Sequence, residues 1–305
     1  MDARRSWALA RARRVRPAAR RVATWAIVAT AAAGAVACWW PGAGRSTRAG
    51  PRYEVHAVRF ATIPKFPKRS LVAGAARMDS VDIAMMFWVV RGEGRTILVD
   101  AGFYRDQFMR QWHPAGYVRP SEAIDRLGIR PDEVTDVILS HIHWDHADGA
   151  DLFPRAKVWL QRDEYAYYVS DSGTPNNRTI DRDVARMLFD LNRAGRVGLV
   201  PGDSQVVLPG ITVYTGGKHT FASEYVGVAT RAGPVVLASD NAYLYENLER
   251  RVPIAQTLDS VSNVAAQGRM LRLAARPSLV VPGHDMQVFT RFPRHTDRVA
   301  RIDEP

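Results

Sequence analysis

Cysteine is almost absent from this chain of 305 residues. The only thiol belongs to Cys38, so an internal disulfide is excluded, and the rest of the chain has no thiolate to offer a structural zinc finger. Internal repeats of short period are also missing, so a repeat architecture is not indicated. With 47% hydrophobic and 24% charged residues, the composition is instead that of an ordinary globular protein with one sizeable core.

Acidic residues are scarce at the N-terminus. Residues 1–52 hold 11 arginines and a single acid, Asp2, and so account for +10 of the net charge of +11. The body of the chain is therefore almost neutral and has no evident field for binding phosphates. A nucleic-acid partner is not expected.

The first 40 residues predict a basic signal peptide or a membrane anchor. Eight arginines lie within residues 1–21, and residues 22–40 carry no charge. This uncharged run is long enough to span a bilayer but is rich in alanine, so a cleaved signal and a retained anchor both stay open. Either outcome places the body outside the cytoplasm, in the periplasm or facing it, with membrane contact only through this segment.

Two further targeting signals in this segment are weak. Arg20-Arg21 is a candidate twin-arginine signal, but the residues that follow fit that pattern poorly. Ala35-Val36-Ala37-Cys38 resembles a bacterial lipobox with alanine where leucine is preferred. Residues 41–52, rich in glycine and proline, are a predicted linker, and residues 53–305 are the predicted folded domain.

Periodicity predicts strands and helices from residue 53 onwards. Strands are expected at 53–61, 83–90 and 96–99, the last two joined by a hairpin whose glycines lie within residues 91–95. Amphipathic helices are expected at 121–127, 181–194 and 258–273. This pattern alone predicts the α/β or α+β class.

The most informative segment is Ser140-His141-Ile142-His143-Trp144-Asp145-His146, which directly follows the apolar run 137–139. It places three of the chain's eight histidines and one aspartate within six residues. Imidazole and carboxylate ligands suit zinc, with manganese, iron or cobalt as alternatives, and the lack of thiolate indicates a catalytic rather than a structural site.

The spacing HxHxDH resembles that of the metallo-β-lactamase superfamily, and later segments supply the ligands that this resemblance requires. His219 follows the apolar strand pattern 211–214, Asp240 follows 235–239, and His284 follows 279–281. Ligands at strand ends are typical of a site held by a rigid scaffold. The resemblance implies a four-layer αββα sandwich.

The resemblance also implies how the ligands are shared. It gives His141, His143 and His219 to one metal and Asp145, His146 and His284 to a second, with Asp240 bridging the two and Asp100 supporting the site through hydrogen bonds. Two divalent ions, expected to be zinc, can lower the pKa of a water held between them and leave positions open for a substrate oxygen. The implied activity is hydrolysis.

Features around the ligands separate the chain from several branches of the superfamily. True metallo-β-lactamases lack the bridging aspartate, whereas this chain has Asp240. Glyoxalase II carries a helical glutathione-binding portion after the last ligand, for which the 21 residues after His284 are too few. A flavin domain, which flavodiiron oxidoreductases require, is not expected here.

The remaining resemblance is to N-acyl homoserine lactonases, over roughly residues 53–290. It rests on Asp240-Asn241-Ala242-Tyr243, with a tyrosine three residues after the bridging aspartate, and on the ending Gly283-His284-Asp285. In that family the tyrosine is catalytic, so the resemblance implies catalytic roles for Tyr243 and Asp145 and a small lactone or ester as substrate. A phenol beside a lactone can hydrogen-bond the carbonyl oxygen or donate to the leaving alkoxide.

Several alternatives stay open. The chain departs from its relatives after His219, which puts the acyl-chain specificity in doubt. An apolar pocket for an acyl chain is one interpretation of Met78, Met85, Met86, Phe87 and Trp88, and core packing is the other. The substrate could also be another ester, a thioester or a lactam, and a metal-binding envelope protein without turnover is the alternative outside enzymes.

Overall fold

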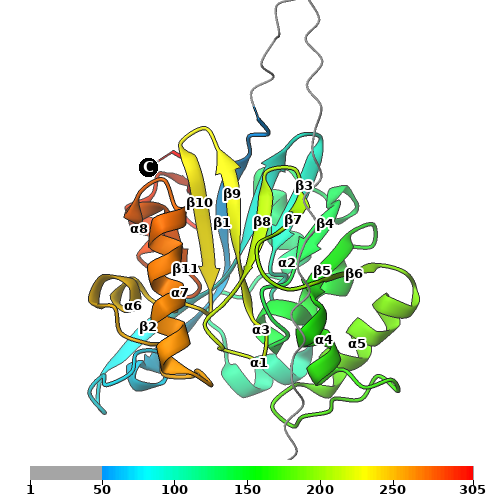
Figure 1. The fold of residues 1–305 in the computed structure, drawn as a ribbon, viewed down its shortest axis with the longest axis horizontal. Helices are drawn as coiled ribbons and strands as arrows, with labels where there is room; N and C mark the ends of the chain where they lie inside the picture. The colour runs from blue at the N-terminus through cyan, green and yellow to red at the C-terminus, as the bar shows by residue number, and fades with distance from the viewer. Residues whose placement is uncertain (1–49, 305) are drawn as a thin grey trace, which may run out of the picture. The chain divides into compact units, whose positions relative to one another are not determined.

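Residues 50–304, which the computed structural model describes, form two stacked β-sheets with helices on both outer faces (Figure 1). The larger sheet has eight strands, in the spatial order β12 (Arg294–Thr296), β13 (Val299–Arg301), β1 (Glu54–Pro67), β2 (Ser80–Gly92), β3 (Arg95–Val99), β4 (Asp136–Ile138), β5 (Lys157–Gln161) and β6 (Val197–Val200). The smaller sheet has five, in the order β11 (Val280–Pro282), β10 (Gly233–Ser239), β9 (Glu224–Thr230), β8 (Ile211–Thr215) and β7 (Gln205–Leu208).

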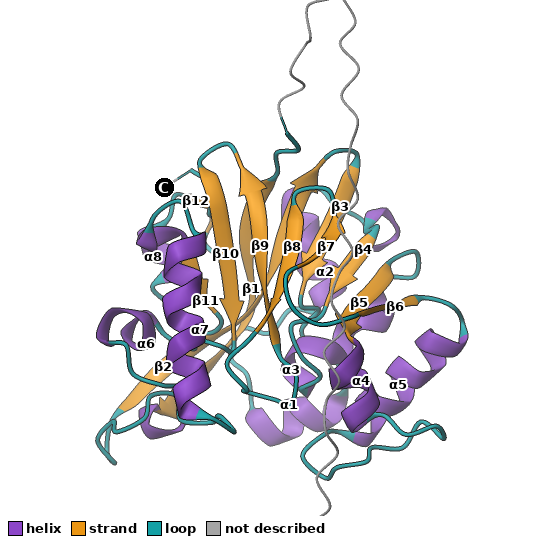
Figure 2. Ribbon diagram, viewed as in Figure 1, coloured by secondary structure: helices purple, strands orange, loops and turns teal. Residues whose placement is uncertain are grey.

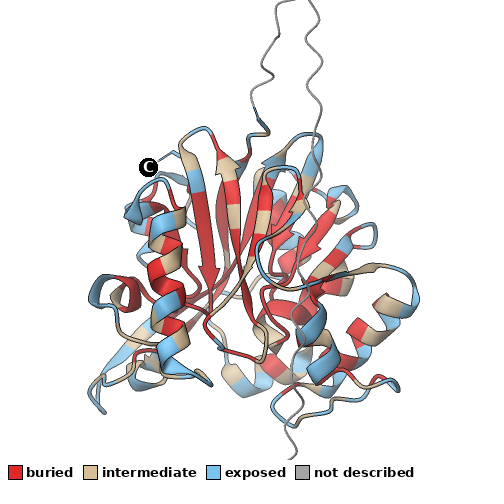
Figure 3. Ribbon diagram, in the orientation of Figure 1, coloured by how far each residue is buried: buried red, intermediate tan, exposed pale blue. Residues whose placement is uncertain are grey.

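Strand β2 explains why the fold needs four layers. Met85 and Phe87 belong to the core on the outer, helix-covered face of the larger sheet, whereas Met86 and Trp88 belong to the core shared with the smaller sheet. Successive side chains of a strand point to opposite faces, so a strand that is apolar from Ile83 to Val90 must be covered on both sides. Figure 3 shows the resulting concentration of buried residues along the strands. The predicted αββα sandwich is confirmed.

Helices cover the two outer faces (Figure 2). The larger sheet is accompanied by α1 (Asp106–Trp112), α2 (Pro120–Ala123), α3 (Trp144–Ala147), α4 (Arg162–Tyr168) and α5 (Arg182–Arg193). The C-terminal half adds α6 (Tyr245–Arg250), α7 (Ser260–Leu273), which lies beside β10, and α8 (Val288–Arg291). Both long helices begin at an aspartate, Asp181 or Asp259, whose carboxylate accepts from the first free backbone N–H groups.

The structure agrees with most of the predicted elements and extends some of them. The helices expected at 181–194 and 258–273 are α5 and α7, and the hairpin between β2 and β3 has its turn at Glu93 and Gly94, both with positive φ, as a tight type I′ turn requires. The predicted first strand runs on to Pro67 through two shifts in register.

Two expectations need correction. The helix predicted at 121–127 is α2 followed by a 3-10 helix over Ile124–Leu127, because the N–H of Gly128, in a left-handed conformation, returns to the carbonyl of Asp125 and tightens the last turn. Met78, grouped above with the residues of an apolar pocket or core, is 88% exposed. It lies in the loop before β2, outside the strand whose alternation buries the other four.

The predicted signal or anchor, residues 1–40, lies outside the described residues, as does most of the predicted linker. Over residues 50–304, no helix combines the length and the apolar character needed to cross a membrane. The proposed domain boundaries remain predictions.

Candidate metal centre

The predicted ligands follow the ends of four strands, and the supporting Asp100 follows a fifth, all at one end of the sandwich. Asp100 follows β3, and the segment from His141 to His146 follows the neighbouring parallel strand β4. In the smaller sheet, Asp240 follows β10 and His284 follows the parallel strand β11, while His219 lies in the loop between β8 and β9. Parallel neighbours end at the same edge of a sheet, so each sheet gathers its own residues there, and the stacking of the two sheets brings both groups together.

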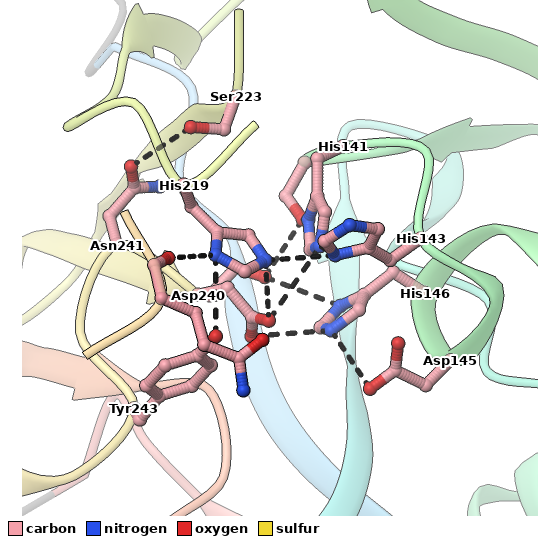
Figure 4. A network of polar contacts seen from close by, with 12 residues as sticks. His141, His143, Asp145, His146, His219, Ser223, Asp240, Asn241 and Tyr243 are labelled. Carbon is pink, nitrogen blue, oxygen red and sulfur yellow. Dashed lines mark hydrogen bonds and ion pairs between the residues drawn. The ribbon is translucent and has the colours of Figure 1, made fainter. Parts of the chain in front are cut away.

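His141, His143, His219 and Asp240 form the first cluster (Figure 4). Their facing atoms all lie within 4.8 Å of one another: His143 Nδ1 is 3.1 Å from His141 Nε2 and 2.9 Å from His219 Nε2, and Asp240 Oδ2 is 3.2 Å from His219 Nε2. Zinc bonds of about 2.0–2.2 Å place tetrahedral ligand atoms roughly 3–4 Å apart, so this cluster has the spacing of a metal site.

Asp145, His146 and His284 form the second cluster. Asp145 Oδ2 is 3.5 Å from His146 Nε2 and 3.7 Å from His284 Nε2. The other carboxylate oxygen of Asp240, Oδ1, is 3.2 Å from His146 Nε2 and 3.0 Å from His284 Nε2. Asp240 therefore presents one oxygen to each cluster, which is the arrangement that a bridging carboxylate needs.

The side chains of the two clusters fit metal ions better than they fit a network in which every polar atom has a hydrogen-bond partner. His146 Nε2 and Asp240 Oδ1 are buried and make no well-formed hydrogen bond, although each is a strong polar group. Unsatisfied buried polar atoms are costly, and a cation placed between nitrogen and carboxylate lone pairs removes that cost. All seven predicted ligands are brought together in this way.

The outer ring nitrogens of the ligands are held by other groups. His219 Nδ1 donates to the carbonyl of Gln256 at 2.8 Å, and His284 Nδ1 donates to the carbonyl of Ala84 at 2.9 Å. Each bond fixes the tautomer that leaves the Nε2 lone pair facing the clusters. These two carbonyls were not predicted, because a backbone acceptor leaves no signal in the sequence.

Asp100 supports the second cluster from behind. Its fully buried carboxylate lies 2.8 Å from His146 Nδ1 and accepts from Ser239 Oγ at 2.8 Å and from the Ser140 backbone N–H at 2.8 Å. The carboxylate thus joins the ends of β3, β4 and β10. This contact with His146 is the supporting arrangement that the resemblance implied.

Burial and neighbouring charges divide the histidines into two kinds. Burial, reinforced by His146 and His219, holds the pKa of His141 well below its ordinary value, and burial lowers the pKa of His143 to about 3. Burial would also lower the pKa of His146, but Asp240, Asp145 and Asp100 outweigh it and raise that pKa well above the ordinary value. His141 and His143 are thus neutral imidazoles, whereas carboxylate charge is concentrated around His146.

Three non-glycine residues with positive φ angles lie beside the ligands. Asp100, Lys218 and Ser239 adopt positive φ angles of 63°, 59° and 46°, and the last two directly precede His219 and Asp240. Non-glycine residues rarely take this conformation unless the surrounding structure enforces it, and functional sites are where such strain gathers.

Two glycines let the His219 loop approach its neighbours. A Cβ atom on Gly216 would lie 1.9 Å from Asn241 Oδ1, and one on Gly217 would lie 2.4 Å from the Cα of Asn263. Asn241 Oδ1 instead accepts from the Gly217 N–H at 2.7 Å. The Gly-Gly pair before Lys218 and His219 is therefore required by close packing.

A cavity of about 190 Å³ opens onto both clusters. Its polar lining comes from five of the ligands, from Tyr243 and from the exposed residues Thr179 and Gln256. The remaining lining is apolar and comprises Ile63, Phe66, Leu71, Ile83, Met85, Trp112 and Trp144. Of the five residues considered for an apolar pocket, only Met85 lines it.

The aromatic wall of this cavity is held by stacking. The indole of Trp144, which lies between two ligands in the sequence, is stacked 5.5 Å from Trp112 and 4.5 Å from Phe108, both on α1. Phe66, from the end of β1, stacks on Trp112 at 6.1 Å. Sequence analysis missed Phe66 and Trp112, which are distant from every ligand motif.

Tyr243 lies where the sequence placed it, beside both clusters. Its hydroxyl is 3.3 Å from His219 Nδ1, and its ring packs against those of His219 and His284. Burial, with the charges of Asp240 and Asp145, raises the pKa of Tyr243 well above its ordinary value. The phenol therefore keeps its proton and can act as a hydrogen-bond donor towards the cavity.

These features define a metal centre on a four-layer sandwich, and comparison with known proteins gives its family. The sequence profile of the metallo-beta-lactamase superfamily matches residues 86–284, so the chain belongs to that superfamily. This span runs from β2 to the last predicted ligand, His284.

Similar proteins include several lactonases. An N-acyl homoserine lactonase from Bacillus sp is 28% identical over 230 residues, covering 68% of this chain and 84% of the relative. N-acyl homoserine lactonase AiiB from Agrobacterium fabrum is 25% identical over 236 residues, covering 71% and 85%. A crystal structure of an N-acyl homoserine lactone hydrolase, with N-hexanoyl-L-homoserine at its catalytic metal centre, shares the fold with a TM-score of 0.65 at 19% identity, covering 78% of this chain and 95% of that one. The predicted resemblance to this family is confirmed.

Proposed function

We propose that this protein is an exported dinuclear zinc hydrolase that opens the lactone ring of N-acyl homoserine lactones. The observation that carries the proposal is one cavity in which the phenol of Tyr243 and an apolar wall both face the paired histidine–aspartate clusters. The lactonases described above, which this chain resembles, support the same substrate class.

The seven clustered side chains would hold two zinc ions. His141, His143 and His219 would hold the first, Asp145, His146 and His284 the second, and Asp240 would bridge them. When bound, the ions would make water a competent nucleophile near neutral pH and polarise a carbonyl oxygen.

Tyr243 and Asp145 would provide the proton chemistry. The Tyr243 hydroxyl would donate a hydrogen bond to the lactone carbonyl oxygen, where negative charge develops as water attacks the carbonyl carbon. Asp145 lines the cavity, with its side chain 15% exposed, and its carboxylate would take the proton released by the attacking water. That proton would pass to the ring oxygen as its bond to the carbonyl carbon breaks, so the products are a free hydroxyl and a carboxylic acid.

The shape of the cavity suits the two ends of such a substrate. The polar lactone would lie over the clusters, and the acyl chain would extend along the wall formed by Phe66, Leu71 and Met85. Thr179 and Gln256, which are exposed and line the cavity, would offer polar groups for the amide that joins the two parts.

A substrate panel tests the proposal. The purified body loaded with zinc should release one proton per ring opened from N-acyl homoserine lactones, followed in weakly buffered solution. Thioesters and β-lactams should be turned over poorly or not at all. Turnover of a thioester or a β-lactam, with no lactone of any chain length opened, would leave a metallohydrolase of another substrate class. Zinc binding without turnover of any compound would indicate a metal-binding protein.

Export is proposed from the sequence of residues 1–40. A reporter enzyme fused after Arg52 should be active only outside the cytoplasm, because the arginine-rich start and the uncharged run of residues 22–40 have the organisation of a signal or an anchor. Comparison with Cys38→Ala separates the modes of attachment. Lipid labelling that persists in this variant excludes acylation at Cys38, and reporter activity confined to the cytoplasm would contradict export altogether.

A further inference from the structure

The first cluster is assembled from two loops that belong to different sheets. His141 and His143 lie in the loop after β4 of the larger sheet, and His219 lies in the loop before β9 of the smaller one. Their facing nitrogens come within 2.9–3.1 Å. A metal site needs its ligands fixed to within a fraction of an ångström, so the spacing of these two loops has to be set by some contact between them.

One carboxyl group reaches both loops. Glu164, on α4, accepts from the backbone N–H of Ile142 at 3.3 Å through Oε1, and from that of Ala222 at 2.7 Å through Oε2. Ile142 lies between His141 and His143, and Ala222 lies three residues after His219. The side chain of Glu164 is therefore a cross-link between the two ligand loops, although it makes no hydrogen bond to a ligand side chain.

The location of Glu164 is unusual for its residue type. It is fully buried in a short helix whose neighbouring charged residues, Arg162 and Asp163, are exposed. Glutamate is rarely buried unless it has specific partners, and this side chain uses both oxygens on backbone donors. The same face of α4 also presents Tyr168, whose hydroxyl accepts from the Phe221 N–H at 3.2 Å. The helix thus binds the His219 loop at two successive residues.

We propose that Glu164 is a positioning residue that sets the spacing of His141, His143 and His219, and thereby the affinity of the first cluster for its metal ion. This inference rests on the proposed metal binding and not on the proposed substrate. Asp145, His146 and His284 make no hydrogen bond with this side chain, so we expect the second cluster not to depend on it.

The test is Glu164→Gln in the protein carrying both metals. An amide of the same shape can accept from only one of the two N–H groups, because its NH₂ must then face the other donor. We expect the affinity for one of the two zinc ions to fall about 10- to 100-fold, the range typical of lost support around a metal ligand, while the other ion binds as in the wild type. Competition with a chromophoric chelator measures both affinities.

A second readout separates positioning from general stability. Zinc should raise the melting temperature of the wild type, and this metal-induced rise should be smaller in Glu164→Gln, whatever the melting temperatures of the two metal-free proteins. Glu224→Gln is the matched control, because Glu224 is equally buried but its carboxyl accepts from Gln161 Nε2 at 2.6 Å and holds neither ligand loop. The control should keep both zinc affinities.

Three results would overturn the proposal. They are wild-type affinity for both ions in Glu164→Gln, an equal loss of both ions, and a lower melting temperature with an unchanged metal-induced rise. Should Glu164→Gln fail to fold, Tyr168→Phe removes only the second contact of α4 with the His219 loop and should weaken the same ion by a smaller factor. A wild type that binds two ions but opens no lactone would overturn the proposed function alone.

Discussion

Replacing Asp240 by Ala should abolish hydrolysis and reduce the metal content from two zinc ions per chain to at most one weakly held ion. Asp240 is the one described side chain with an oxygen facing each cluster, at 3.2 Å from His219 Nε2 and 3.0 Å from His284 Nε2. Its loss removes one ligand and one negative charge from both sites at once. Because the proposed metals would activate the attacking water, we expect the rate to fall by about 10⁴-fold or more.

Elemental analysis and chelator competition on the purified variant measure this result. Asp303→Asn is a suitable control, because Asp303 is as buried as Asp240 but accepts from the Val55 N–H at the opposite end of the larger sheet. The control should keep two ions and full activity even if it is less stable. Two tightly bound ions in Asp240→Ala, or at most one ion in the wild type after reconstitution with excess zinc, would contradict a bridged dinuclear centre.

The ligands could be predicted from the sequence because each of them follows an apolar run that has to be a buried strand. Strand ends are fixed by the sheet, so a residue one to three positions beyond β4, β10 or β11, as His141, Asp240 and His284 are, has little freedom in where it lies. The motif from His141 to His146 then specifies the chemistry locally. His219 lies farther from its strand, and it was located through the order of ligands in the family.

The cavity wall could not be predicted in the same way. Phe66 reaches the wall because β1 continues beyond the predicted strand, and the register shift between Ile63 and Phe66 changes the direction of its last side chains. Trp112 reaches the wall because α1 packs its aromatic face on Trp144. Both depend on tertiary packing between segments whose local sequence shows no sign of a ligand site. The substrate specificity of the enzyme is therefore harder to predict from the sequence than the ligands of its metal centre.

The role of Glu164 could not be predicted from the sequence either, for a related reason. In the sequence Gln161-Arg162-Asp163-Glu164 it resembles one more charged residue on an exposed helix, and only the structure reveals that its side chain is buried against two backbone N–H groups. Every residue except proline has a backbone N–H group, so the residue types at positions 142 and 222 give no sign that these groups bind Glu164. The same holds for the carbonyls of Gln256 and Ala84, which orient His219 and His284.

Replacing Tyr243 by Phe should lower kcat for lactone opening about 10- to 10³-fold with little change in KM. The substitution keeps the ring that packs against His219 and His284 and removes only the hydroxyl. A donor that acts on charge developing in the transition state affects kcat, and losing one such donor costs about 10²–10³ in rate, or nearer tenfold where a metal ion shares the same oxygen. Proton release at saturating and limiting substrate separates kcat from kcat/KM.

Tyr245→Phe is the matched control for this prediction. Tyr245 is also a buried tyrosine, but it does not line the cavity, and its ring lies against the guanidinium of Arg291 at 3.8 Å. Removing its hydroxyl should leave kcat unchanged. Zinc content must stay at two ions in both variants, since Tyr243 supplies no ligand. If Tyr243→Phe retains both ions and wild-type kcat, the phenol is only a packing group, and stabilisation of the developing oxyanion must then come from elsewhere in the cavity.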